Sequence, residues 1–208
     1  MKGCAVALGW LLVASQVMGD DGLRIGPDDW PWWRGPNRNA VARVQKVPTT
    51  WSETKNIVWK AAVPGRGHGS PIVVGSRVFL ESADEQKQTQ FVLCYDRATG
   101  KQLWQKQLHA GGFDGRFHKK NTRASSTLAC DGERVFAPFY NAGALWLTAL
   151  DLEGKQLWQK KLGNFVSHWG YSASPCLYQS LVIVAGDHKG EGGGYLVALD
   201  RQSGAEKW

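Results

Sequence analysis

A repeat that occurs three times constrains the fold of this chain more than any other feature. Three segments end in similar sequences, C-Y-D-R-A-T-G-K-Q-L-W, A-L-D-L-E-G-K-Q-L-W and A-L-D-R-Q-S-G-A-E-K-W. They close on Trp104, Trp158 and Trp208, so the repeat spacings are 54 and 50 residues. Periods in this range are typical of repeat folds, in which each unit buries its apolar surface against its neighbours.

Each repeat contains four short apolar runs separated by turn residues, and the first runs follow Ser70, Ser126 and Ser174. Four such strands are expected to form one antiparallel sheet. In the closing turn, an aspartate can bond the backbone ahead of it, a glycine supplies positive φ, and the tryptophan can wedge between sheets. The residues that define the repeat are Asp96, Gly100, Trp104, Asp151, Gly154, Trp158, Asp200, Gly204 and Trp208.

We therefore predict an all-β chain, a β-propeller with four-stranded antiparallel blades of about 50 residues. The repeats span about residues 67–108, 121–162 and 170–208, within a propeller region at 57–208 that follows a lead-in segment at 20–56. Residues 57–61 resemble an outermost strand without upstream partners, which makes three blades plus one orphan outer strand. A sandwich or a linear stack is less favoured, because radial stacking keeps sheet edges short.

Residues 1–19 have the pattern of a secretory signal peptide. Lys2 precedes an apolar run at 4–14, and Val17-Met18-Gly19 predicts cleavage before Asp20. The apolar run is about half the ~20 residues that span a bilayer, so we expect a periplasmic or secreted protein without a membrane span.

The net charge of +7 comes from scattered basic residues, whereas nucleic-acid-binding proteins usually cluster them. We therefore expect no nucleic-acid partner. Cleavage would leave Cys94, Cys130 and Cys176, an odd number without metal-ligand spacing. All three lie in apolar runs, where buried free cysteines are common.

The loops that enter the innermost strands are expected to face the central channel and carry the candidate ligand-binding residues. Three histidines in these loops are spaced by fifty residues each. They could bind a metal or, with the arginines, an anion. Alternatively they cap turns and join blades, since their offsets from the following serine differ. Both interpretations remain open at this point, and we assign no metal; the candidate ligand-binding residues are Arg66, His68, His118, Lys119, Asn121, Arg123, His168 and Trp169.

No familiar catalytic motif is present, and we predict no catalytic residue. The sequence lacks G-x-S-x-G, H-E-x-x-H and a P-loop. The glycine-rich stretch at 190–194 fits a hairpin loop. Asp187 and His188 beside it could act as an acid–base pair, but two polar residues in a turn explain them better.

The repeat ending A-L-D-x-x-x-G-x-x-x-W resembles that of pyrroloquinoline-quinone-like (PQQ-like) β-propellers. This group includes quinoprotein alcohol dehydrogenases and the propeller lipoprotein of the outer-membrane barrel-assembly machinery. W-P-W-W-R-G-P-N-R-N-A at 30–40 resembles the lead-in of secreted bacterial members, and the resemblance covers residues 30–208. Family members usually have seven or eight blades. The resemblance thus implies an N-terminal fragment of a chain of roughly 400 residues.

The resemblance implies two functions. One is an exported, non-catalytic binding or assembly scaffold without a cofactor, whose partner is a protein or a small-molecule or carbohydrate ligand at the channel face. The other is a periplasmic PQQ- and calcium-dependent alcohol or sugar dehydrogenase. Such enzymes typically use acidic calcium ligands and often an adjacent cysteine pair, which these loops lack. The scaffold is therefore favoured. A polysaccharide hydrolase would need paired carboxylates in the channel.

Overall fold

The computed structural model describes residues 22–43, 46–113 and 118–208, in which strands are the regular structure. The predicted signal peptide lies outside these residues. The strands are β1 Ile72–Val74, β2 Arg77–Asp84, β3 Thr89–Asp96, β4 Gln102–Ala110, β5 Ala129–Cys130, β6 Arg134–Asn141, β7 Ala144–Asp151, β8 Gln156–Asn164, β9 Cys176–Tyr178, β10 Leu181–Gly186 and β11 Tyr195–Asp200. The predicted all-β class is confirmed.

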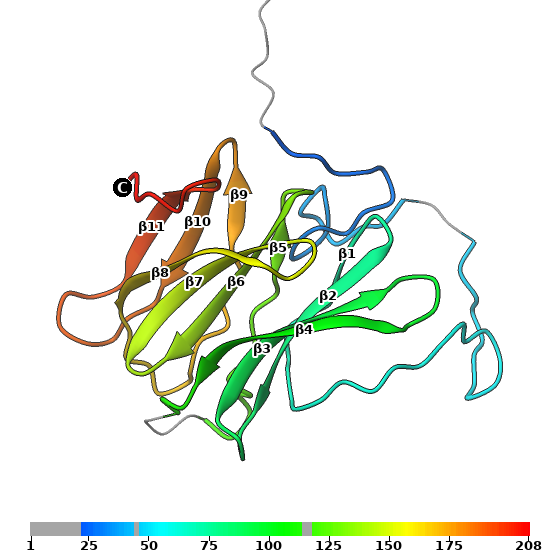
Figure 1. Cartoon of the computed structure of the whole chain (residues 1–208), viewed down its shortest axis with the longest axis horizontal. Coiled ribbons are helices and arrows are strands. Elements are labelled where there is room, and N and C mark those ends of the chain that lie inside the picture. Colours follow the sequence, from blue (N-terminus) through cyan, green and yellow to red (C-terminus); the bar gives the residue numbers. More distant parts are fainter. Residues whose placement is uncertain (1–21, 44–45, 114–117) are drawn as a thin grey trace, which may run out of the picture.

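The strands form three antiparallel sheets, one for each repeat (Figure 1). Strands β1–β4 and β5–β8 make four-stranded sheets, and β9–β11 make a three-stranded one. In the third sheet the last residues take the place of the fourth strand. The Lys207 N–H donates to the Ala198 carbonyl at 2.8 Å, and the Ala198 N–H donates to the Trp208 carbonyl at 2.8 Å. The predicted propeller blades are confirmed.

The two complete sheets match in register as well as in sequence. Asp96 pairs with Arg77 in the first sheet, and Asp151 pairs with Arg134 in the second. Both sheets also have two register shifts between their last two strands, at equivalent places. Such bulges increase local twist, so the outer strand of each blade curves in the same way.

The closing turns have the predicted geometry. The Oδ1 atom of each aspartate accepts backbone N–H groups ahead of it, from Thr99 at 2.8 Å in the first repeat and from Ser203 at 2.9 Å in the third. These bonds favour the charged carboxylate. Hydrogen bonds from Thr99 lower the pKa of Asp96, and those from Ser203 lower the pKa of Asp200.

Each closing glycine lies beneath the indole of a preceding tryptophan. A Cβ atom on Gly154 would come within 2.8 Å of the Trp104 ring, and one on Gly204 within 2.7 Å of Trp158. The indole Nε1–H also donates to a carbonyl of the same turn. These bonds are Trp59 to Arg97 at 2.9 Å, Trp104 to Leu152 at 3.0 Å and Trp158 to Arg201 at 3.2 Å.

The expected orphan outer strand at 57–61 is not assigned as a strand. Trp59 nevertheless occupies the place of an outer-strand tryptophan, since a Cβ atom on Gly100 would lie 2.5 Å from its ring. The contact between an indole and a closing glycine therefore forms at the first blade although Trp59 does not lie in a strand.

The lead-in segment is integrated into the propeller. Trp30 exchanges two backbone hydrogen bonds with Val73 of β1, at 2.7 and 2.9 Å. The Pro31 carbonyl accepts the Cys130 N–H of β5 at 2.8 Å. Figure 1 shows this segment in blue beside β1 and β5. The lead-in thus pairs with the inner strand of the first sheet and forms one hydrogen bond with the inner strand of the second.

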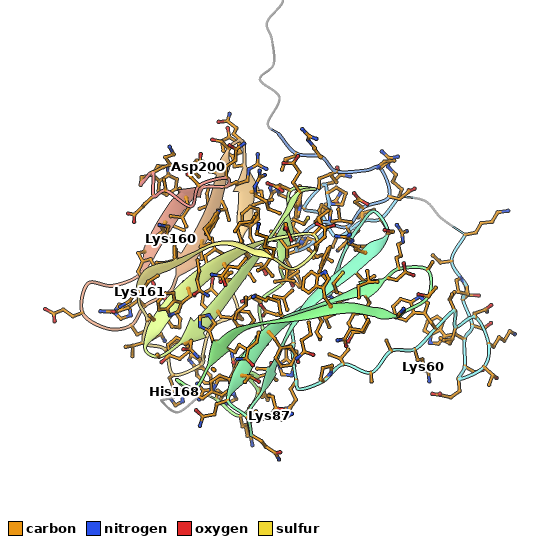
Figure 2. All side chains as sticks on the ribbon, viewed as in Figure 1. Lys60, Lys87, Lys160, Lys161, His168 and Asp200 are labelled. Carbon is orange, nitrogen blue, oxygen red and sulfur yellow. The ribbon has the colours of Figure 1, made fainter. Side chains whose placement is uncertain are left out.

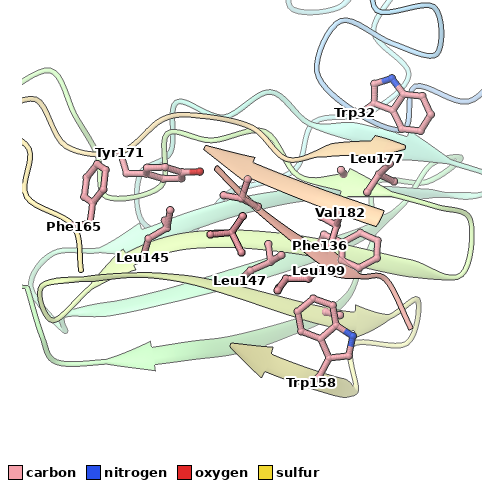
Figure 3. Packing of buried hydrophobic residues seen from close by; sticks show 14 residues of the cluster. Trp32, Phe136, Leu145, Leu147, Trp158, Phe165, Tyr171, Leu177, Val182 and Leu199 are labelled. Atoms are coloured by element: carbon pink, nitrogen blue, oxygen red, sulfur yellow. The ribbon is translucent and has the colours of Figure 1, made fainter. Parts of the chain in front are cut away.

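The largest core cluster joins the second and third sheets. Phe136, Leu145 and Leu147 of the second sheet pack in one cluster with Val182 and Leu199 of the third (Figure 3). Members of the cluster outside these strands are Trp32, Phe165 and Tyr171. Burial of such side chains stabilises the stacked sheets by about 1.5–3 kcal/mol each.

We expect Gly204→Ala to destabilise the protein more than Gly143→Ala does. Both glycines have positive φ, +68° and +71°, so the backbone strain is similar. A Cβ atom at residue 204 meets the Trp158 ring, whereas one at residue 143 meets nothing within 4 Å. Urea unfolding should show a difference of about 1–3 kcal/mol between the variants. Equal losses would contradict the indole contact.

Candidate functional site

Five of the eight predicted ligand-binding residues line one hollow of about 470 Å³, which we call the basic hollow. It lies between the loop before β1, the β2–β3 turn and the β4–β5 connection. Its lining residues are Arg66, Glu85, Gln88, Phe113, His118, Lys119, Asn121 and Arg123. Loops from two neighbouring repeats therefore converge here.

Arg66 is held by a two-way backbone pairing with β2. Its N–H donates to the Ala83 carbonyl at 2.8 Å, and its carbonyl accepts the Ala83 N–H at 2.9 Å. Gly65 makes this pairing possible: it has φ +74°, and a Cβ atom there would lie 2.5 Å from the Ala83 carbonyl oxygen. Since the backbone is fixed, the Arg66 side chain is presented at the rim.

Arg123 is fixed on the opposite wall. Its guanidinium lies 4.7 Å from the Phe113 ring centroid and donates to the Phe113 carbonyl at 3.2 Å. Its carbonyl accepts a hydrogen bond from Gln90 at 2.8 Å, and its N–H donates to Asn121 Oδ1 at 2.9 Å. The wall is therefore tied to the first sheet and needs little ordering when a ligand binds.

The three predicted histidines do not form one cluster. His118 and His168 both contact Trp169. The centroid of the Trp169 ring lies 4.7 Å from that of His118 and 5.1 Å from that of His168. His68 lines a different hollow. Within the described parts of the chain, no group of three or more histidine, cysteine or acidic side chains is arranged to hold a metal ion.

The basic hollow is electrostatically one-sided. Among the described residues, Arg66, Lys119 and Arg123 bring three cations to a lining that contains one carboxylate, Glu85. The arginines offer planar donor groups suited to carboxylates, and the lysine adds a mobile charge. This arrangement can attract and orient an anionic group.

A buried acid that the sequence reasoning missed lies between the inner loops. Glu81 of β2 is only 3% exposed, and its Oε1 accepts the Ser126 N–H at 2.6 Å. Burial raises the pKa of this carboxyl well above its ordinary value. Among the described residues, its Oε2 and the buried Tyr171 hydroxyl have no hydrogen-bond partner. Both residues line a cavity of about 10 Å³, room for about one water molecule.

The repeats themselves could have revealed Glu81. In the register set by the paired aspartates, the equivalent residues are Pro138 in β6 and Ala185 in β10. Neither is charged, so blade structure does not require an acid at this position. Charge in an otherwise apolar inner strand was the available signal.

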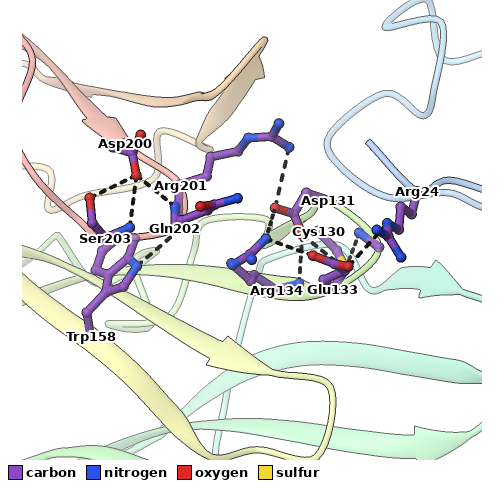
Figure 4. Close-up of polar contacts among 11 residues, drawn as sticks. Arg24, Cys130, Asp131, Glu133, Arg134, Trp158, Asp200, Arg201, Gln202 and Ser203 are labelled. Carbon is purple, nitrogen blue, oxygen red and sulfur yellow. Dashed lines mark hydrogen bonds and ion pairs between the residues drawn. The ribbon is translucent and has the colours of Figure 1, made fainter. Parts of the chain in front are cut away.

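Other acids have structural partners. Asp131 is buried, and its Oδ2 lies 3.1 Å from Arg134 and 3.4 Å from Arg201. These contacts join the second and third repeats (Figure 4).

His188 also has a structural contact. Its Nδ1 accepts the Val166 N–H at 2.9 Å, so the imidazole joins two loop segments.

The cysteines differ from the sequence expectation at one position. Cys94 and Cys130 are buried, and burial raises the pKa of each thiol to about 12. Cys176 is exposed, because its strand β9 alternates and turns this residue away from the core.

Comparisons with two solved structures agree with this architecture. Two solved structures align well: europium-containing methanol dehydrogenase (18% identity, TM-score 0.62, 88% of this chain and 32% of that one) and quinohemoprotein alcohol dehydrogenase from Comamonas testosteroni (19%, 0.67, 87% and 27%). BamB from Moraxella catarrhalis aligns with 14% identity and a TM-score of 0.31, over 71% and 63%. The chain spans about a third or less of the two dehydrogenases. No curated protein matches it.

The fold and its repeats define a PQQ-like repeat β-propeller. The family model described as outer membrane protein assembly factor BamB matches residues 37–208, and the chain belongs to this family. The described residues contain no helix long and apolar enough to cross a membrane.

We expect Glu81→Gln to make stability less dependent on pH. Because the folded-state pKa of Glu81 lies above its ordinary value of 4.5, its stabilising contribution is complete below about pH 4.5 and is lost as the pH rises through the folded pKa. In urea unfolding, the variant should match wild type near pH 4 and exceed it near pH 8. The exposed Glu85→Gln is the control. Parallel profiles for wild type and Glu81→Gln would contradict a buried neutral acid.

Proposed function

We propose that this chain belongs to an exported, non-catalytic propeller that acts as a binding or assembly scaffold. Its basic hollow recognises an acidic segment of a partner protein. The observation that carries this proposal is the convergence of Arg66, Lys119 and Arg123 on one hollow, whose described residues include a single carboxylate, Glu85. An acidic segment would place carboxylates beside Arg66 and Lys119.

The site is suited to binding more than to chemistry. Among the residues that the structure describes, Glu85 is the one carboxylate of the lining, and the buried acid Glu81 lines a separate, much smaller cavity. The membership in a family described as an assembly factor supports a protein partner. On this reading the propeller needs neither PQQ nor calcium.

The proposal predicts saturable binding of a poly-glutamate peptide of about ten residues, weakened by salt because exposed charges are screened. Removing two cations, in Arg66→Gln/Lys119→Gln, should weaken the affinity by roughly tenfold, mainly through slower association. The matched control is Lys160→Gln/Lys161→Gln, which removes two exposed charges of β8 (Figure 2). Calorimetric titration gives the affinities, and a poly-serine peptide tests for charge dependence.

Two results would overturn this assignment. Equal affinity of the two double variants would show that the peptide binds outside the basic hollow. Calcium with PQQ giving a saturable thermal shift, together with dye reduction in the presence of an alcohol, would show a dehydrogenase in place of a scaffold.

We also propose that the protein is exported by its first nineteen residues. N-terminal sequencing of protein recovered outside the cytoplasm should begin at Asp20. Leu11→Arg should block processing, because a charge interrupts the apolar run of the signal. Processed and exported Leu11→Arg protein would contradict this route.

A further inference from the structure

A second hollow lies where the lead-in segment meets the loops before β5 and β9. Its volume is about 470 Å³, within the range of small-molecule sites. We call it the serine hollow; its lining residues include Trp33, Arg34, Arg38, His68, Thr127 and Ser174. It shares no lining residue with the basic hollow.

Arg38 fixes the lead-in against the third sheet. Its Nη2 donates to the Leu177 carbonyl at 2.6 Å, and its Nη1 donates to Cys176 Sγ at 3.2 Å. The guanidinium also lies over the Trp32 ring, 4.9 Å from the centroid. The chain turns tightly at Gly35, where φ is +72° and a Cβ atom would be 2.6 Å from Trp30. The wall that carries Trp33 and Arg34 is thus built into the fold.

The side chains of this hollow present unused hydrogen-bond donors. Among the described residues, the exposed Arg34 guanidinium forms no ion pair. His68 is held through its backbone, whose N–H donates to the Ala124 carbonyl at 2.8 Å. Its exposed imidazole lines the hollow and can donate a hydrogen bond.

The hydroxyl groups of this hollow are also placed to donate hydrogen bonds. Thr127 Oγ1 accepts the Ser70 N–H at 3.0 Å, and Ser174 Oγ accepts the Thr127 N–H at 3.0 Å. Since each oxygen is already used as an acceptor, its O–H proton is the group most readily offered to a ligand. No acidic or amide side chain belongs to the lining set. A ligand rich in acceptors therefore suits this lining, and an oxyanion is the strongest acceptor.

Trp33 adds a second requirement. Its side chain is 53% exposed at the rim, so a large indole surface is open to a bound group. The apolar face of a flat ring can cover this surface while polar substituents reach the donors. The lining thus combines a ring platform with an anion site.

We propose that the serine hollow binds an acidic saccharide, with the sugar ring against Trp33 and its carboxylate against Arg34. The imidazole of His68 and the hydroxyls of Thr127 and Ser174 hydrogen-bond the remaining oxygens. This site is independent of the proposed binding of an acidic protein segment, so either proposal can fail without the other.

Titration of the protein with trigalacturonate tests the proposal, with neutral maltotriose and acetate as reference probes. We expect saturable binding of trigalacturonate at least about tenfold tighter than that of maltotriose or acetate. Arg34→Gln should remove most of this preference, because it removes the cation. Trp33→Ala should weaken the binding of trigalacturonate and leave the binding of acetate unchanged. The matched controls, Arg43→Gln and Trp51→Ala, alter exposed residues outside this hollow and should bind as wild type does.

Several results would overturn the proposal, provided that thermal unfolding shows each variant folded. Absence of saturation up to about 10 mM would show that no useful site exists. Equal binding of trigalacturonate by wild type and Arg34→Gln would place the ligand elsewhere. Competition in which PQQ displaces trigalacturonate at lower concentration would assign the hollow to a planar quinone.

A further comparison tests whether the two proposed sites are separate. Loss of peptide binding in Arg66→Gln/Lys119→Gln, with trigalacturonate binding retained, would confirm that they are.

Discussion

The stacking of an indole on the glycine of the next closing turn is the contact on which blade packing depends. It occurs with Trp59, Trp104 and Trp158, and each indole also donates to a carbonyl of the turn that it covers. One side chain therefore supplies both apolar burial and satisfaction of a backbone acceptor. Because each contact joins consecutive repeats, the position of a sheet is set by its predecessor, as in a chain of nearest-neighbour interactions.

Polar groups between the sheets follow a different rule, since a buried charge is costly unless it is paired. Asp131 meets this condition: one oxygen contacts two arginines and the other accepts backbone N–H groups. Glu81 meets it only in part, with one bonded oxygen. Burial therefore shifts this group towards its neutral form. An acid retained at such a cost, where the other repeats have Pro138 and Ala185, is a functional candidate.

The sequence predicted the fold well because the repeat is local. Asp96 and Gly100 lie four residues apart and specify their turn without help from distant residues. The grouping of Arg66 with Lys119 and Arg123 was only partly foreseeable, since it depends on how two sheets are placed by Trp104. The equal spacing of His68 and His118 suggested that they converge, whereas their different offsets from the following serine indicated the separation that the structure shows. Glu81 was overlooked because a single charge in a strand leaves the apolar pattern intact.

The lead-in segment shows why architecture and binding are linked in this chain. An inner strand such as β1 or β5 would leave one edge open, and open edges promote association with other chains. Trp30 covers the edge of β1 by backbone pairing, and Pro31 accepts one hydrogen bond from β5. The same contacts hold the chain two and three residues before Trp33, and Trp33 and Arg34 line one hollow with the loops before β5 and β9. Protection of the edges therefore helps to place an aromatic platform and a cation that forms no ion pair among the described residues. A change that loosened this pairing would disturb the serine hollow before it disturbed the blades.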